Sequence, residues 1–267
     1  MMPTEDEIRT FWEDGAVHLR GVLHSRWVEE IQTAIDAIVA DPDRPGRVWK
    51  TNSEQSEFYE ESNASRRSES LRRVIGESSL SRVAGQLLES DRIACVFDQV
   101  FVKQAGKVVK GTDWHQDLPY MPFSGEQVCV FWIPVDHVSR ENSLEFVRGS
   151  HADRQLYRFS TPGHGELDLP PVPDIENERH NFDIFSFDCA PGDVVVFHMR
   201  MLHGAATRRD VPTQRRTLSI RWAGDDVRYC TRDRISLIRP KPRLAEGEEI
   251  FGADFPVVWS SAGSGSS

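Results

Sequence analysis

Trp114-His115-Gln116-Asp117 lies between two apolar runs that have the composition of β-strands. In an extended strand, side chains alternate between two faces, so His115 and Asp117 are expected to point the same way while Gln116 points the other way. One imidazole nitrogen and one carboxylate oxygen could then bind the same cation. A hydrogen-bonded or salt-bridged surface pair is the alternative, and the flanking sequence is needed to distinguish the two.

A second histidine, His203, ends the apolar run that begins at Val194. We predict one continuous strand over 194–203, with Phe197 on the face of His203 and His198 on the opposite face. His115, Asp117 and His203 would together form a 2-His-1-carboxylate triad, which leaves coordination positions open on non-haem Fe(II). A core histidine hydrogen-bonded to a backbone carbonyl is the alternative for His203.

The strand predicted over 215–222 carries alternating polar residues. Arg215, Thr217, Ser219 and Arg221 share one face, and polar groups on an inward face are unfavourable unless they meet a ligand or each other. A guanidinium beside a metal site suits bidentate recognition of a carboxylate. An ion pair with one of the 42 acidic residues is the alternative, and we favour it for Arg216.

Composition excludes several classes of protein. The formal net charge of -10 argues against general affinity for nucleic acid, which needs a basic face. The acidic N-terminus has no apolar signal core, and no run approaches about 18 apolar residues, so we expect neither secretion nor a membrane span. Four scattered cysteines, Cys95, Cys129, Cys189 and Cys230, indicate reduced thiols and a cytoplasmic protein.

The N-terminal third has helical patterns. Thr4 and Glu7 have the spacing of a capping box for a short helix that ends at Gly15. A short strand over 16–23 and an amphipathic helix capped by Ser25 are predicted next. The polar stretch 51–69 is interpreted as a surface loop, with an active-site lid as the alternative. Further helices are predicted over 71–75 and 80–88.

After Asp91 the apolar period changes from about 3.6 to about 2. Strands are predicted over 93–103, 128–135, 144–147, 182–187, 194–203 and 215–222, with an excursion over 162–181. Helices followed by short strands predict a mainly β fold with flanking N-terminal α-helices and a jelly-roll core. We expect a single domain over 1–267: a helical part over about 1–90, a β core over about 91–235, and an extension whose tail, 260–267, is disordered.

Several motifs in combination resemble one family. They are His115-Gln-Asp-Leu-Pro-Tyr120, Phe131-Trp-Ile-Pro-Val-Asp-His-Val-Ser-Arg-Glu-Asn142, Gly149-Ser-His151, Gly192-Asp193, Leu202-His-Gly204 and Arg215-Arg-Thr-Leu-Ser219. From about Phe11 to about Trp222 the chain resembles the phytanoyl-CoA dioxygenase family of Fe(II)/2-oxoglutarate oxygenases. The resemblance implies a double-stranded β-helix in which His115, Asp117 and His203 hold iron.

The resemblance also implies a co-substrate site. Arg215 would bind the distal carboxylate of 2-oxoglutarate, and Trp132 and Gln116 match positions near the co-substrate. Thr217 shares the face of Arg215, and Lys103 would add a second positive charge, with an exposed strand lysine as its alternative. Two departures from the family pattern are Asn142-Ser143 in place of Asn-Gly and Thr207-Arg-Arg-Asp210 in place of an Asn and a Ser before the arginine.

The reaction implied is oxidation of a C–H bond in a small organic substrate by O2 and 2-oxoglutarate, with release of succinate and CO2. Related halogenases have a small residue at the position of Asp117, so an intact carboxylate favours hydroxylation, desaturation or a related oxidation over halogenation, with hydroxylation as the main expectation. The alternatives are a non-catalytic jelly-roll protein that senses a metal or small molecule, and a cupin-like metalloenzyme that uses O2 without an oxo acid. The identity of the substrate and the oligomeric state are not predicted.

Overall fold

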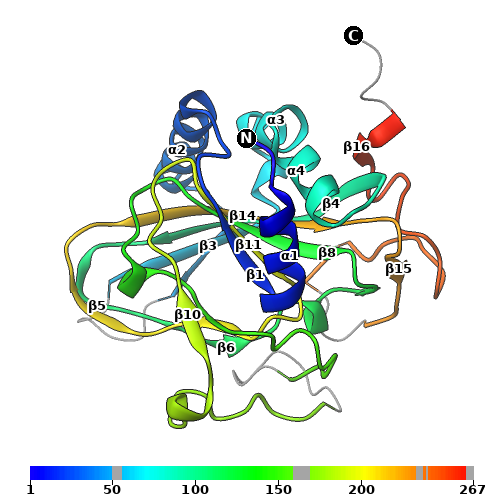
Figure 1. Ribbon diagram of the computed structural model, residues 1–267. Helices are drawn as coiled ribbons and strands as arrows, with labels where there is room; N and C mark the ends of the chain where they lie inside the picture. Colours follow the sequence, from blue (N-terminus) through cyan, green and yellow to red (C-terminus); the bar gives the residue numbers. More distant parts are fainter. Residues whose placement is uncertain (50–55, 159–168, 233–236, 239, 263–267) are drawn as a thin grey trace.

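Two antiparallel β-sheets form the centre of the protein (Figure 1). The computed structural model describes residues 1–49, 56–158, 169–232, 237–238 and 240–262. The strand order in the large sheet is β1 (Ala16–Leu19), β11 (Val194–His198), β8 (Val128–Pro134), β14 (Arg215–Ala223), β4 (Arg92–Lys103), β3 (Phe58–Ser62) and β2 (Arg47–Trp49), with β16 (Val257–Ser260) also paired to β4. The order in the smaller sheet is β10 (Ile184–Ser186), β9 (Glu145–Val147), β12 (His203–Ala205) and β6 (Thr112–His115).

Shorter elements connect the two sheets. Two small ladders pair β13 (Arg208–Val211) with β5 (Gly106–Val109) and β15 (Arg228–Tyr229) with β7 (Phe123–Ser124). Short 3-10 helices are η1 (Ala64–Arg66), η2 (Leu118–Tyr120), η3 (Arg140–Asn142) and η4 (Arg179–Asn181). The α-helices are α1 (Glu5–Asp14), α2 (Ser25–Ala40), α3 (Glu69–Glu77) and α4 (Leu80–Leu87). Among the described residues, no helix has the length and apolar character needed to cross a membrane.

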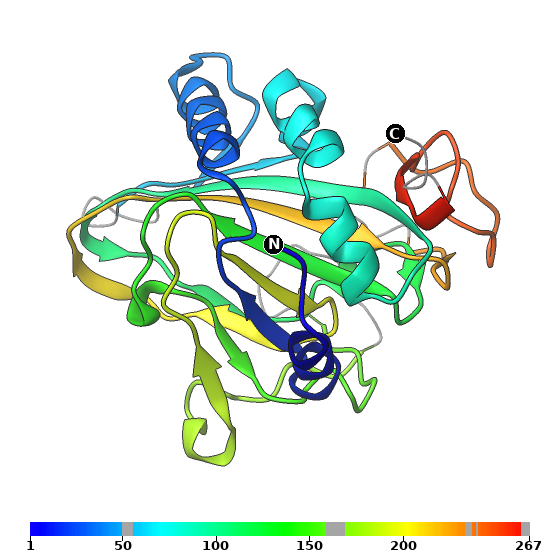
Figure 2. The ribbon, with the colours of Figure 1, turned by 45° about the horizontal axis from the view of Figure 1, so that its top comes forward.

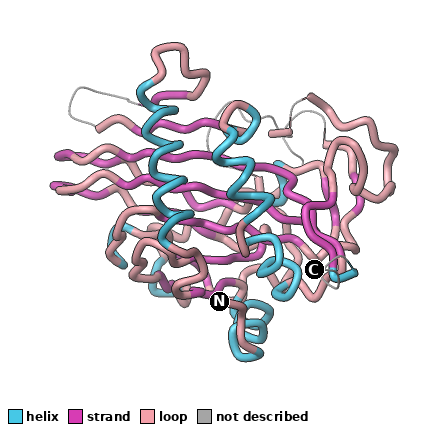
Figure 3. Tube along the Cα trace, turned by 90° about the horizontal axis from the view of Figure 1, so that it is seen from above, coloured by secondary structure: helices cyan, strands magenta, loops and turns pink. Residues whose placement is uncertain are grey.

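Helices α2, α3 and α4 cover the outer face of the large sheet (Figures 2 and 3). The apolar stripe of α2, which includes Ile31 and Ile35, packs in one cluster with Phe131 of β8 and Trp222 of β14. The opposite face of the sheet contributes to a second cluster, where Trp132 and Phe197 meet Phe146 of the smaller sheet. Burial on both faces explains why β8 is a continuous apolar run.

The predicted start and end of the first helix are confirmed. Thr4 accepts a hydrogen bond from the backbone of Glu7, and Glu7 accepts one from the backbone of Thr4. Gly15 ends α1 at φ 85°, a left-handed conformation that glycine adopts readily. The prediction that Ser25 caps α2 is wrong: the cap is His24, whose ring accepts from the backbone N–H of Arg26, and Ser25 is the first helical residue.

The prediction of a loop over 51–69 is wrong for its described part. Residues 50–55 lie outside the described residues, but Phe58–Ser62 forms β3 and pairs with β4. The polar residues are accommodated because Glu61, which is buried, is paired with Arg67 and Tyr59. The described part of this segment thus contains a strand of the large sheet, followed by η1 and the start of α3.

The prediction of one strand over 194–203 is also wrong. Strand β11 ends at His198 and belongs to the large sheet, whereas β12 begins at His203 and belongs to the smaller one. Residues 199–202 make the corner, where the backbone N–H of Met201 donates to the carbonyl of His198 at 2.8 Å. The break carries the chain from one sheet to the other and places His203 opposite the large sheet.

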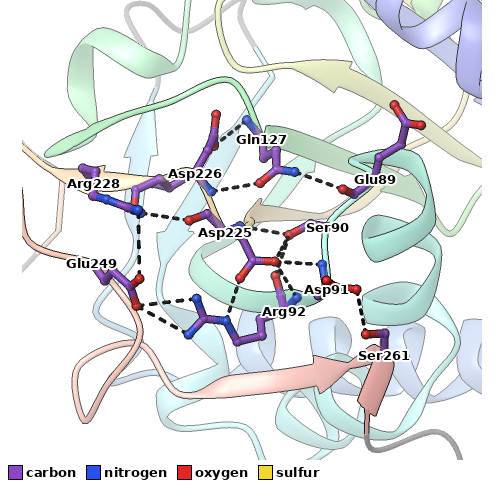
Figure 4. A network of polar contacts seen from close by, with 11 residues as sticks. Glu89, Ser90, Asp91, Arg92, Gln127, Asp225, Asp226, Arg228, Glu249 and Ser261 are labelled. Carbon is purple, nitrogen blue, oxygen red and sulfur yellow. Dashed lines mark hydrogen bonds and ion pairs between the residues drawn. The ribbon is translucent and has the colours of Figure 1, made fainter.

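A polar network holds the end of β14 against the start of β4 (Figure 4). Asp225 Oδ2 accepts from Ser90 Oγ at 2.9 Å and from the backbone N–H groups of Asp91 and Arg92 at 2.8 and 3.0 Å. Asp225 Oδ1 accepts from Arg92 Nε at 2.6 Å. Ser261 also bonds to Asp91, so part of the predicted disordered tail is ordered, while 263–267 lie outside the described residues.

Candidate metal centre

Strands β6 and β12 bring the two predicted histidine ligands together. His203 is the direct cross-strand partner of His115, and Asp117 follows β6 by two residues. Asp117 Oδ1 lies 3.5 Å from His115 Nε2 and 3.9 Å from His203 Nε2. One donor atom from each residue lies within 4.8 Å of the other two, so the three side chains could hold one metal ion.

The sequence predicted that strand alternation would bring Asp117 to the side of His115. In the structure, Asp117 reaches this point in a different way. Strand β6 ends at His115, and Asp117 has helical dihedral angles, φ -82° and ψ -37°, as the cap of η2. Its backbone N–H donates to the carbonyl of Met199 at 2.9 Å, in the corner between β11 and β12. The carboxylate is therefore fixed by contact with the same corner that leads into His203.

Backbone carbonyls orient both imidazole rings. His115 Nδ1 lies 2.8 Å from the carbonyl of Asp113, and His203 Nδ1 lies 2.9 Å from the carbonyl of Met201. A carbonyl oxygen only accepts, so Nδ1 carries the proton in each ring and the lone pair is on Nε2. Both Nε2 atoms face Asp117 Oδ1. The tautomer with the proton on Nδ1 is the one that metal coordination at Nε2 requires.

The charges of this cluster suit a divalent cation. Burial, followed by the nearby His115, lowers the pKa of His203 to about 3, so its ring is neutral near pH 7. Burial alone would raise the pKa of the Asp117 carboxyl, but Arg221 and the two histidines hold it well below its usual range. The imidazoles of His115 and His203 and the ionised carboxylate of Asp117 are the donor set of the facial triad that binds Fe(II).

Arg221 contacts the metal-ligand candidate Asp117 directly. Its Nε and Nη2 lie 3.0 and 2.8 Å from Asp117 Oδ2, and the pair is buried. The sequence placed Arg221 on the inward face of its strand but did not identify this partner. The alternation of polar residues from Arg215 onward was the sequence signal for the inward position of Arg221. Strand β14 confirms it, because Arg215, Ser219 and Arg221 all line the pocket beside the triad.

The pocket contains two cations on neighbouring strands. Arg215 and Lys103 are cross-strand partners between β14 and β4, and both line the pocket. Their hydrogen bonds go to neutral oxygens: Arg215 Nη1 donates to the carbonyl of Asn142, and Lys103 Nζ donates to the carbonyl of Lys110 at 2.8 Å. Among the described residues no carboxylate pairs with either side chain.

Burial shifts the pKa of both cations. It lowers the pKa of Arg215 to about 10, and together with the charges of Arg215 and Lys110 it lowers the pKa of Lys103 well below its usual range. Two cations held in a pocket without a counter-ion form a site for an anion. Lys103 is buried rather than an exposed strand lysine.

Trp132 lies in the pocket, whereas two other predicted co-substrate contacts do not. Trp132 is buried, and the guanidinium of Arg215 lies 5.4 Å from its ring centre. Gln116 is outside the pocket lining, and its amide joins loops by donating to the carbonyls of Gln155 and Arg200. Thr217 is buried beside the pocket but is not part of its lining. Their placement gives no support to co-substrate contact by Gln116 or Thr217.

The outer wall of the pocket comes from residues that the sequence analysis did not select. Trp49, Phe58, Glu60, Gln99 and Phe101 line it from β2, β3 and β4. In the structure Phe58 and Glu60 alternate with the buried Tyr59 and Glu61, but the residue types themselves show no alternation of apolar and polar character, and the stretch was interpreted as a loop. Of the apolar residues near the triad, Tyr120 lines the pocket, and Trp114, Met121 and Phe123 pack in the core instead.

Similarity to known proteins agrees with this geometry. The model of the Phytanoyl-CoA dioxygenase (PhyH) family matches residues 11–210. The chain therefore belongs to the phytanoyl-CoA dioxygenase family. A probable phytanoyl-CoA dioxygenase of Caenorhabditis elegans is 27% identical over 126 residues, which are 46% of this chain and 39% of that protein. The chain thus spans less than half the length of this curated relative.

Solved structures share the fold. The epimerase SnoN, in complex with Fe3+, alpha ketoglutarate and nogalamycin RO, superposes with a TM-score of 0.75 at 20% identity over 95% of this chain and 98% of SnoN. The carbocyclase SnoK gives 0.73 at 18% over 96% of each chain. EctD from S. alaskensis, with 2-oxoglutarate and 5-hydroxyectoine, gives 0.66 at 18% over 91% and 85%. The predicted mainly β fold with flanking helices is confirmed.

Proposed function

We propose that this protein is an Fe(II)/2-oxoglutarate-dependent dioxygenase that oxidises a C–H bond of a small organic substrate. The observation that carries the proposal is a single pocket that contains both the donor cluster of His115, Asp117 and His203 and the cation pair of Arg215 and Lys103. A metal-binding protein needs only the first group of residues. An enzyme that binds a dicarboxylate beside its metal needs both.

The chain's own residues would bind and orient the reactants. The two imidazoles and Asp117 Oδ1 would hold Fe(II), and Arg215 with Lys103 would bind the distal carboxylate of 2-oxoglutarate. Trp132 and Phe197 would shield the site from water, because both are buried and line the pocket. O2 would be the oxidant: at the bound metal one oxygen atom would go to 2-oxoglutarate, which leaves as succinate and CO2, and the other would oxidise the substrate C–H bond.

Hydroxylation is the outcome we propose. A small residue at position 117 would leave a ligand position open for a halide. The carboxylate of Asp117 lies among the donor atoms and would fill that position. SnoN is a non-heme alpha ketoglutarate dependent epimerase and SnoK a non-heme alpha ketoglutarate dependent carbocyclase, so proteins that share this fold and co-substrate differ in their reaction. The result therefore depends on which substrate carbon the pocket wall presents to the metal.

Two measurements test the proposal. Under anaerobic conditions with Fe(II), calorimetry should show 2-oxoglutarate binding that is weakened at least about tenfold by Arg215→Gln, because a charge-assisted contact is lost. Arg216→Gln is the matched control, since Arg216 lies on the same strand but pairs with Asp136 and Asp36. With O2 and candidate substrates, succinate release should require the triad. Equal binding of 2-oxoglutarate by the wild type and Arg215→Gln would contradict the assignment.

A further inference from the structure

The two oxygens of the Asp117 carboxylate have different neighbours. Oδ1 faces the two imidazoles, at 3.5 Å from His115 Nε2 and 3.9 Å from His203 Nε2. Oδ2 receives both Nε and Nη2 of Arg221, at 3.0 and 2.8 Å. The carboxylate therefore offers one oxygen to the metal position while a guanidinium holds the other.

Arg221 has a third nitrogen with a different environment. Nη1 is buried and has no hydrogen-bond partner among the described residues. Arg221 lines the pocket from β14, and its guanidinium carbon lies 5.3 Å from the ring centre of Phe97, which packs against the fork. Buried donors in folded proteins are nearly always paired, so an unpaired one in a pocket lining indicates a ligand that supplies the acceptor.

Charge compensation of Asp117 explains only part of this arrangement. An ion pair accounts for Nε and Nη2, and a lysine or a single donor could also neutralise the carboxylate. It does not account for Nη1, which is buried without a hydrogen-bond partner among the described residues although Arg221 lines the pocket. Arg215 and its cross-strand partner Lys103 on β4 belong to the pocket as well, but they bind other oxygens. Arg215 begins β14, six residues before Arg221.

We propose that Arg221 is a second anion-recognition residue of this site, which fixes Asp117 with two nitrogens and donates through Nη1 to an anionic or oxygen-bearing ligand beside the metal. This inference rests on the proposed function, since it requires a metal at the triad. The class of ligand is a small anion, such as a carboxylate. A positive charge here strengthens binding of such ligands.

The test uses Co2+ as the metal probe and azide as the anionic probe, in chloride-free buffer with the full-length chain. Azide is titrated at saturating Co2+ and followed by visible absorbance, so its affinity is measured independently of metal affinity. The variants are Arg221→Gln, which removes the charge and the fork, and Arg221→Lys, which keeps the charge. Arg216→Gln is the control, because Arg216 points to the opposite face of the same strand and pairs with Asp136 and Asp36.

We expect Co2+ affinity within about threefold of wild type in both Arg221 variants, because the three ligands remain. Azide affinity should fall at least about tenfold in Arg221→Gln and by a smaller factor in Arg221→Lys, since a charge-assisted donor is lost. Arg216→Gln should leave both affinities unchanged.

Three results would overturn the inference. The first is unchanged azide affinity in Arg221→Gln, and the second is an equal fall in azide affinity in Arg216→Gln. The third is loss of Co2+ binding in both Arg221 variants, which would make Arg221 a support for the metal ligand and nothing more. Failure of the wild type to bind Co2+ is a separate result, because it would remove the proposed function itself.

Discussion

His115 and His203 are direct partners across the β6–β12 pair, with ring centres 4.2 Å apart. Each ring is oriented by a carbonyl of its own strand region, Asp113 for the first and Met201 for the second. The metal site thus depends on the register of one short strand pair, and a shift of one residue would turn one imidazole to the opposite face.

Replacement of either histidine should remove most of the metal affinity. For His203→Gln we expect Co2+ or Mn2+ affinity to fall by more than about 100-fold, because loss of an outer-shell partner alone costs about 10–100-fold. Calorimetry with the metal-free protein gives the affinity directly. His137→Gln is the control, since His137 is exposed and contacts only Asp188 in the described structure. Similar losses in both variants would contradict the assignment of the site.

Alternation along single strands was predictable from the sequence, and breaks between strands were not. The polar face of β14 was predicted from Arg215, Ser219 and Arg221, because strand geometry fixes a period of two over a long element. The end of β11 was missed because Met199 and Met201 are as apolar as the strand before them, so composition carries no sign of the corner. Asp117 was assigned to the site because strand alternation would place it beside His115. In the structure β6 ends at His115, and Asp117 lies at the start of η2 instead.

The edge of the large sheet was missed for a different reason. In β3, the aromatic pair Phe58-Tyr59 is followed by the acidic pair Glu60-Glu61, and the buried acid Glu61 is stabilised by Arg67, which follows the strand. Local propensity disfavours such a strand, so only the tertiary pairing with β4 identifies it. The pocket wall formed by Phe58 and Glu60 was therefore not predictable from local pattern alone.

Binding of 2-oxoglutarate should be accompanied by proton uptake at Lys103. Burial and the charges of Arg215 and Lys110 hold the pKa of Lys103 well below its usual range, and a bound dianion would raise it again. Affinity should then be greatest where Lys103 is protonated and should fall as the pH rises. Calorimetry in two buffers of different ionisation enthalpy, repeated across a range of pH, counts the protons. Uptake should be close to zero in Lys103→Met, and equal uptake in both proteins would exclude Lys103 as its source.

Asp225→Ala should destabilise the fold without changing the metal site. Asp225 accepts hydrogen bonds from Ser90, Asp91 and Arg92 (Figure 4). Leaving these donors unpaired should lower the free energy of unfolding by about 2–4 kcal/mol, measured by urea denaturation. Metal affinity should stay at the wild-type value, since Asp225 does not line the pocket. Asp188→Asn, at an exposed carboxylate, should change the stability by less than about 0.5 kcal/mol.

His198 should make the protein less stable in mild acid. The ring is buried and is fixed in its neutral form, because Nδ1 accepts from the backbone N–H of Arg200 at 3.0 Å and Nε2 lies 3.0 Å from the carbonyl of Glu126. A proton on Nδ1 would face another donor. Burial, with the charges of Arg200 and His151, lowers the pKa of His198 to about 3.

The sign of this effect follows from proton binding. An unfolded histidine has a pKa of about 6.5, so between that value and about 3 the unfolded chain binds a proton at His198 that the folded chain does not. The stabilising contribution is fully present above about pH 6.5 and is lost as the pH falls, with a limiting slope of about 1.4 kcal/mol per pH unit. His198→Gln should be less stable than wild type near pH 7, and the difference should shrink toward about pH 4. Urea denaturation of both proteins across this range measures the difference, in which the other titrating groups cancel because both proteins contain them. A difference independent of pH would show that His198 does not titrate on unfolding.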